Sequence, residues 1–201
     1  MEQAGITVKS KDFQLLMKEV RSCTLCIDQF PHGARPVVQL HPDARVLVAG
    51  QAPGSRVHAT GIPFDDPSGD RLREWMGIDK SRFYDERQIA LMPMGFCYPG
   101  KGKSGDLPPV PLCADTWRER LLARLPNIRL ILAIGQYAQA WHLTDRHKTL
   151  TETVRAWPQY GNGLLPLPHP SPRNNIWIRR NPWFQEEVLP ELAKRVANAL
   201  A

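Results

Sequence analysis

Four cysteines are the residues in this chain whose types and spacing most directly predict chemistry. Cys23 and Cys26 form a C-x-x-C pair, while Cys97 and Cys113 stand at the two ends of a loop rich in glycine, proline and lysine. A disulfide framework is a poor interpretation, because a chain of 201 residues can bury its own core and begins without an apolar secretory segment. Four thiols with one tight pair instead favour a shared metal site.

The wide spacing of the second pair bears on which metal group such a site would hold. Zinc usually takes four thiolates from two C-x-x-C pairs, and this sequence has only one such pair. An iron–sulfur cluster accepts cysteines from segments that lie further apart. Three alternatives stand at this point: an iron–sulfur cluster, a zinc ion, or four thiols that share no site.

The composition is typical of a soluble globular protein, and the net charge favours a polyanionic partner. Apolar residues make up 42% of the chain and charged residues 23%, which is ordinary for one domain, and we expect a single domain over residues 1–201. The net charge of +6 favours a partner such as nucleic acid. No apolar run is long enough to span a membrane. We therefore expect a cytoplasmic monomer without a membrane partner.

Short apolar runs alternate with helical patterns along the chain. Four such runs are expected to be buried strands, at 44–50, 89–95, 130–135 and 164–170. Helices are expected from about residue 13 to Cys23, at 71–77, 114–125 and 136–142, and from 182 onward. This alternation predicts an α/β fold, a three-layer α/β/α sandwich with a central four-stranded parallel sheet.

Three loops that could carry chemistry follow predicted strands. Ligands of parallel sheets bind beyond the carboxyl ends of the strands, so these loops are expected to share one rim. The first is the tight turn G-Q-A-P-G (50–54), the second follows Cys97, and the third is H-P-S-P-R-N-N (169–175). After the first turn, T-G-I-P-F (60–64) and D-D-P-S-G (65–69) place an aromatic ring near two carboxylates.

In this order, the motifs resemble the uracil-DNA glycosylase superfamily, and most closely its iron–sulfur branches, the families numbered four and five. The ordered set covers nearly the whole chain, from the C-x-x-C pair to the 169–175 motif, which makes the resemblance specific although each motif is short. It implies a [4Fe–4S] cluster, with zinc as the alternative occupant, and DNA containing a damaged or deaminated base as the partner. The implied ligands are Cys23, Cys26, Cys97 and Cys113.

The resemblance also implies a reaction, the hydrolysis of the N-glycosidic bond of uracil or a related deaminated base during base excision repair. Such a base must be flipped out of the helical stack and held against an aromatic face, and Phe64 is at the matching position. His169 would stabilise the departing base anion. Asp66 would activate water and stabilise the cationic sugar, with Asp65 as the alternative. Asp66 could also cap the following helix, and the two roles are compatible.

The remaining site residues are implied by the same resemblance. The base would be contacted by Gly50, Ala52, Pro53, Gly54 and Asn174. Ser171 and Arg173 would contact DNA beside the lesion, and the Arg173 guanidinium could stack in the space that the base vacates. Lys101 and Lys103 would add an attraction to phosphates that salt weakens.

Two positions depart from the family pattern. Gln51 stands where family four carries a glutamate, and a glutamine cannot act as a general base although its amide can orient water within the catalytic set. Pro93 replaces an asparagine that reads the uracil edge, so strict uracil selectivity is not expected. These departures keep two functions open: a monofunctional glycosylase, or a catalytically weak protein of the same fold that binds DNA and senses damage.

Overall fold

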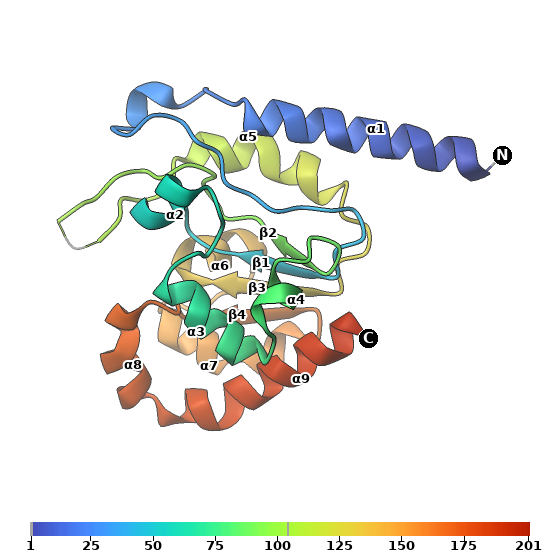
Figure 1. The fold of residues 1–201 in the computed structure, drawn as a ribbon. Coiled ribbons are helices and arrows are strands. Elements are labelled where there is room, and N and C mark those ends of the chain that lie inside the picture. Colours follow the sequence, from blue (N-terminus) through green and yellow to red (C-terminus); the bar gives the residue numbers. More distant parts are fainter. Residues whose placement is uncertain (1, 104) are drawn as a thin grey trace.

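A sheet of four parallel strands forms the centre of the molecule (Figure 1). The computed structural model describes residues 2–103 and 105–201, and the side chains among these from residue 11 onward. The strands are β1 (Val46–Ala49), β2 (Ile89–Leu91), β3 (Leu130–Ile134) and β4 (Leu164–Leu167). Their order is β2-β1-β3-β4, and every neighbouring pair is parallel. The predicted four-stranded parallel sheet is confirmed.

Helices connect the strands and cover the sheet. They are α1 (Glu2–Arg21), α2 (Ser55–Thr60), α3 (Pro67–Met76), α4 (Lys80–Phe83), α5 (Pro111–Leu122), α6 (Gly135–His142), α7 (Leu150–Arg155), α8 (Asn175–Arg180) and α9 (Leu189–Leu200). The sequence predictions omitted α2, α4, α7 and α8. For α7 a signal was present, because Thr149 and Glu152 form a reciprocal capping box at its start.

Side chains of the strands alternate between the two faces of the sheet, and each face has its own helical layer. Val46 and Val48 belong to a core that α3, α7 and α9 cover. Leu47, which lies between them, packs in a second core with α1 and α5 on the opposite side. Figure 1 shows these layers above and below the sheet. The expected α/β/α sandwich is therefore present.

Several element ends differ from the predicted ones, and prolines explain most of the differences. β2 ends at Leu91 rather than near residue 95, because Pro93 has no N–H with which to continue the ladder. α5 begins at Pro111, three residues earlier than expected, since a first-turn proline loses no helical hydrogen bond. This early start brings Cys113 into the first turn of the helix.

The C-terminal segment is not one continuous α-helix as predicted. A π-helical turn (Phe184–Val188) precedes α9, and Pro190 lies in the first turn of α9. No helix in the part of the chain that the structure describes combines the length and apolar character needed to cross a membrane.

Candidate active site and cysteine cavity

A cavity of about 320 Å³ lies at the carboxyl ends of the strands. Its volume is at the lower end of the range typical of small-molecule sites, roughly 300–1,000 Å³. The residues expected to do chemistry at this rim line it together: Gly50, Gln51, Ala52, Pro53, Gly54, Phe64, Asp66, His169, Ser171 and Arg173. The loops after β1, β2 and β4 thus converge on one space, as the parallel topology predicted.

Phe64 is fixed in position by its backbone and by its neighbours. Its φ angle of 55° lies in the left-handed region, which is uncommon for a residue other than glycine. A Cβ at Gly69 would overlap the Phe64 carbonyl oxygen, so only glycine permits this approach of α3. The Phe64 ring packs edge-to-face against Phe83, with 6.0 Å between the ring centroids. The aromatic face is therefore preorganised at the cavity wall.

Asp66 caps α3 and also borders the cavity. Its Oδ1 accepts a hydrogen bond from the backbone N–H of Gly69 at 2.9 Å, so the predicted helix cap is confirmed. This bond leaves the second carboxylate oxygen available to other groups. Asp65 is absent from the described residues that line the cavity. The geometry thus favours Asp66 over Asp65 as the carboxylate beside a bound ligand.

His169 is partly buried and held in one orientation. The backbone N–H of Ser171 donates to His169 Nδ1 at 3.1 Å, and the side-chain amide of Asn174 donates to the His169 carbonyl at 2.7 Å. Burial lowers the pKa of His169, and the nearby carboxylates of Asp66 and Asp106 partly oppose this effect. The ring is therefore neutral near pH 7. Because Nδ1 accepts a hydrogen bond, we assign the proton to Nε2.

Gln51 connects the turn after β1 to the loop between the last two cysteines. Its Nε2 donates to the carbonyl oxygen of Leu107 at 2.9 Å. The backbone N–H of Gly95 in turn donates to the carbonyl oxygen of Gln51 at 2.9 Å. The side-chain amide is consequently oriented, and its oxygen has no hydrogen-bond partner among the residues described.

Pro93 lines the cavity with a side chain that cannot form hydrogen bonds. Its carbonyl oxygen accepts a hydrogen bond from Nη1 of the fully buried Arg118 at 2.9 Å, and so does that of Met92 at 3.0 Å. Pro93 is therefore an apolar part of the cavity wall.

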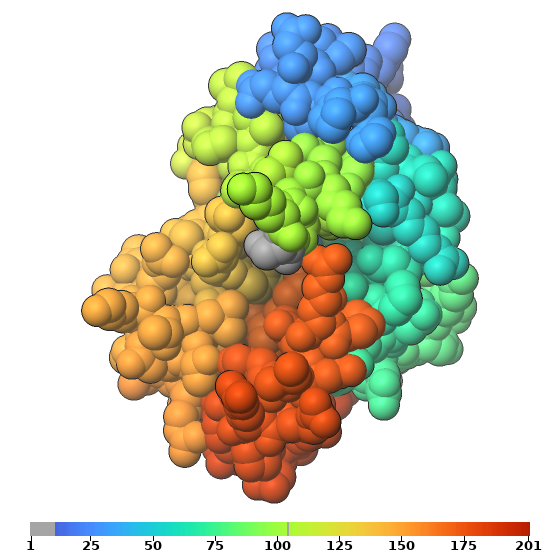
Figure 2. Space-filling view, turned by 90° about the vertical axis from the view of Figure 1, so that its left-hand side faces the viewer, coloured from blue at the N-terminus to red at the C-terminus, as the bar shows by residue number. Residues whose placement is uncertain are grey.

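The residues expected to contact DNA fall into two groups. Ser171 and Arg173 line the cavity, whereas Asn174 lines a neighbouring cavity that shares Gln51 and His169 with it. Lys101 and Lys103 are exposed on the loop after Cys97 and line neither cavity. In Figure 2, this loop (green) lies directly above the segment that follows β4 (orange-red).

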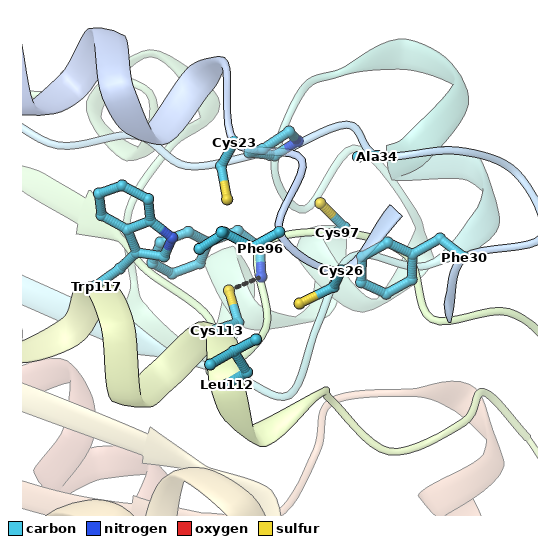
Figure 3. A pocket seen from close by; sticks show the side chains of 11 residues that line it. Cys23, Cys26, Phe30, Ala34, Phe96, Cys97, Leu112, Cys113 and Trp117 are labelled. Atoms are coloured by element: carbon cyan, nitrogen blue, oxygen red, sulfur yellow. Dashed lines mark hydrogen bonds between the residues drawn. The ribbon is translucent and has the colours of Figure 1, made fainter. Parts of the chain in front are cut away.

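The four cysteines surround a separate, largely apolar cavity beside α5, which we call the cysteine cavity (Figure 3). Its lining includes Cys23, Cys26, Cys97, Cys113, Phe30, Phe96, Leu112 and Trp117. Figure 3 shows the four sulfur atoms directed into this one space. The backbone N–H of Phe96 donates to Cys113 Sγ at 3.3 Å. The four thiols therefore line one shared cavity.

Burial strongly affects the acidity of these thiols. It raises the pKa of Cys97 to about 11 and that of Cys113 to about 12. The pKa of Cys26 is also raised, first by burial and second by the nearby Cys23 thiol. Without a cation nearby, Cys97 and Cys113 are therefore protonated at neutral pH, and binding of a metal by these thiols would release protons. Within the described ranges, no group of three or more histidine, cysteine, aspartate or glutamate side chains is arranged to hold a metal ion.

The fold and the cavity define an α/β protein with an aromatic face, a carboxylate and a neutral histidine at the carboxyl edge of its sheet. A family model described as the uracil DNA glycosylase superfamily matches residues 37–193. The match covers most of the chain, and the protein belongs to the uracil DNA glycosylase superfamily. Membership indicates a glycosylase-type function in DNA repair with DNA as the substrate. The matched range contains Cys97 and Cys113, but Cys23 and Cys26 precede it.

Several residues that line the cavity were missed by the sequence analysis, and one of them carries a carboxylate. Asp106, from the loop between Cys97 and Cys113, lines the cavity together with Asp66 and His169. No motif surrounds Asp106, and the segment reads as an ordinary surface loop. Only the folding of that loop onto the turn at 50–54 reveals its position.

Proposed function

We propose that this protein hydrolyses the N-glycosidic bond of uracil, or of a related deaminated base, after the nucleotide has flipped out of DNA. The observation that carries the proposal is that Phe64 and Asp66, from the segment before α3, line one cavity with His169, from the segment after β4. Flipping costs a few kcal/mol, and stacking on an aromatic face returns about 1–3 kcal/mol per base. Phe64 supplies that face.

His169 is the residue that stabilises the departing base. As the bond breaks, negative charge develops on the base, and a preorganised N–H beside a base oxygen stabilises this charge. The proton that we assign to Nε2 meets this requirement, since the Ser171 N–H occupies Nδ1. A neutral imidazole suffices for one hydrogen bond.

Asp66 supplies negative charge beside the sugar, where positive charge develops. Its Oδ1 accepts from the N–H of Gly69, which fixes the carboxylate at the edge of the cavity and leaves the second oxygen free of this bond. Gln51, oriented through its bond to Leu107, can accept a hydrogen bond from water with its side-chain oxygen.

The cysteine cavity belongs, in this proposal, to a [4Fe–4S] cluster held by Cys23, Cys26, Cys97 and Cys113, which would place the chain in an iron–sulfur branch of the superfamily. The bound cluster would act as a structural crosslink between the segment after α1 and both ends of the 97–113 loop. This loop contacts Gln51 through Leu107, so its placement affects the cavity.

Substrate choice follows from the wall at Pro93. Because no side-chain amide reads the base edge there, we propose that the pocket discriminates less strictly than one containing an asparagine and accepts other deaminated bases.

The test is an excision assay on oligonucleotides that each carry one modified base, followed by alkaline cleavage at abasic sites. We expect excision by the wild type and a loss of at least 100-fold in rate in His169→Ala and Asp66→Asn. The asparagine keeps an oxygen for the cap of α3, so the fold is preserved. His147→Ala, on the exposed surface, is the control and should retain full activity.

The alternative function is that of a protein that binds damaged DNA without cutting the glycosidic bond. Gln51 and Pro93 are the positions that favour it. Tight binding to an oligonucleotide with a modified base, without release of any base from the panel, would establish this alternative and overturn the enzymatic proposal.

A further inference from the structure

The loop between Cys97 and Cys113 is held by its own backbone hydrogen bonds and reaches the candidate active site. Lys101 and Asp106 form an antiparallel bridge. The backbone N–H of Gly102 donates to the Gly105 carbonyl at 2.6 Å, and that of Leu107 donates to the Gly100 carbonyl at 2.9 Å. These bonds pair residues 100–102 with residues 105–107 as the two arms of a short hairpin, so the position of Asp106 is set by paired backbone.

The hairpin is docked against both loops that carry the site. Gln51 donates to the Leu107 carbonyl at 2.9 Å. On the other side, Arg173 Nη1 lies 2.9 Å from the point that a Cβ of Gly105 would occupy. The Asp106 carboxylate lies against the turn after β1, with Oδ2 3.6 Å from the corresponding point at Gly54. Asp106 is therefore held between the turn at 50–54 and the segment after β4.

Two carboxylates face the cavity, and their surroundings differ. Asp66 has one oxygen committed to the cap of α3. The Asp106 side chain is exposed and has no hydrogen bond or ion pair with any residue that the structure describes. Both carboxylates are close enough to His169 to affect its protonation. Asp106 is thus a solvent-exposed acceptor at the mouth of the cavity, where attacking water would enter.

Asp106 can supply the proton acceptor for the attacking water that Gln51 cannot provide. A glutamine can orient water but cannot take a proton from it. Gln51 and Asp106 are brought together because the Gln51 side chain is bonded to the residue that follows Asp106. An oriented water between an amide oxygen and a carboxylate has both the positioning and the proton acceptor that hydrolysis needs.

We propose that Asp106 is a second catalytic carboxylate, the base that takes the proton from the attacking water; the proposal rests on the proposed glycosylase function. The water oxygen forms a bond to C1′ of the sugar, and the bond from C1′ to the base nitrogen breaks. Its electron pair leaves with the base, whose anion accepts a hydrogen bond from His169. The water proton passes to Asp106 and then to the released base, which gives a free base and an abasic sugar.

The experiment compares Asp106→Asn and Asp106→Glu with the wild type in single-turnover excision of the base that the wild type removes best. Asp115→Asn makes the same charge change on the exposed surface of α5 and is the matched control. We expect Asp106→Asn to slow excision about 100-fold and Asp106→Glu to regain at least a tenth of the wild-type rate.

Binding to an oligonucleotide with a 2′-fluorinated, non-hydrolysable nucleotide separates chemistry from recognition. We expect Asp106→Asn to bind it within twofold of the wild type. If Asp106→Asn excises the base as fast as Asp115→Asn does, Asp106 is not the catalytic base. The same follows if Asp106→Asn loses as much affinity as rate. Either result leaves the proposed glycosylase function standing. A wild type that excises no base overturns the proposed function together with this role.

Discussion

The Nη2 of Arg118 lies 2.7 Å from Nε2 of His142, inside the molecule and behind the wall of the candidate active site. Arg118 is completely buried, and none of the residues that the structure describes gives it a carboxylate partner. Its other contacts are the carbonyl oxygens of Met92 and Pro93, at 3.0 and 2.9 Å. The guanidinium thus holds the chain between β2 and Cys97, which leads from the substrate cavity to the cysteine cavity.

Replacing Arg118 with methionine should destabilise the protein by about 3 kcal/mol, because the two carbonyl oxygens lose their buried donor. Urea unfolding followed by fluorescence measures the change. Arg124→Met is the control, since Arg124 forms only an exposed ion pair with Asp12, and its cost should stay below about 1 kcal/mol. Equal unfolding midpoints for the two variants would contradict the structural role of Arg118.

The same contact predicts a pH dependence of stability. Burial, and secondarily Arg118, lowers the pKa of His142 to about 4 from the ordinary value of 6.5. The unfolded state therefore binds a proton between pH 6.5 and 4 that the folded state does not. Through this group, stability should decrease on acidification across that range by up to about 1.4 kcal/mol per pH unit, and remain unaffected above it.

A glutamine at position 142 isolates this contribution, since its side-chain oxygen can accept from Arg118 without titrating. The free energy of unfolding of His142→Gln, measured between pH 7 and pH 4, should fall less steeply than that of the wild type. His147→Gln, at an exposed site, should leave the slope unchanged. Identical slopes in all three proteins would show that His142 is not the titrating group.

Gly69→Ala should disturb the aromatic platform without touching a ligand. The added Cβ would overlap the carbonyl oxygen of Phe64, so either α3 or Phe64 must move. We expect destabilisation of about 2 kcal/mol and a loss of excision activity of at least tenfold. Gly163→Ala is the comparison, because an added Cβ there would lie 3.6 Å from its nearest neighbour, the carbonyl oxygen of Arg129. This variant should lose little stability and little activity.

Phe64→Ala tests the platform itself. Losing a stacking partner worth about 1–3 kcal/mol should reduce kcat/KM by roughly 10- to 100-fold. Phe64→Trp keeps an aromatic face and should retain more activity than the alanine variant. Circular dichroism checks that the fold survives in each case. An alanine variant with wild-type kcat/KM would mean that the flipped base does not stack on this ring.

Metal analysis of the purified protein tests the cysteine cavity. We expect iron and inorganic sulfide, with broad absorbance near 400 nm, and loss of both in Cys113→Ser. A serine at 113 removes one sulfur while keeping the size of the side chain at the start of α5. A colourless protein that holds one zinc ion would support the alternative occupant, and a protein without any metal would contradict the proposal of a metal site.

Local sequence signals predicted much of the fold and part of the site. Apolar runs placed all four strands, and the parallel topology put the turn at 50–54 and His169 on one rim. Asp66 was expected as a helix cap, and its bond to Gly69 confirms it. Such features are determined by residues close together in the chain, so the sequence alone carries them.

Tertiary structure decided what depends on contacts between distant segments. Asp106 borders the cavity only because its hairpin docks on Gln51 and Arg173, and no local pattern encodes that docking. Arg118 lies in a predicted helix without any local signal of burial, yet carbonyl groups that follow β2 make it a buried donor. Hydrogen bonding and burial arise from the packed chain as a whole, which is why these two residues could be assigned only from the structure.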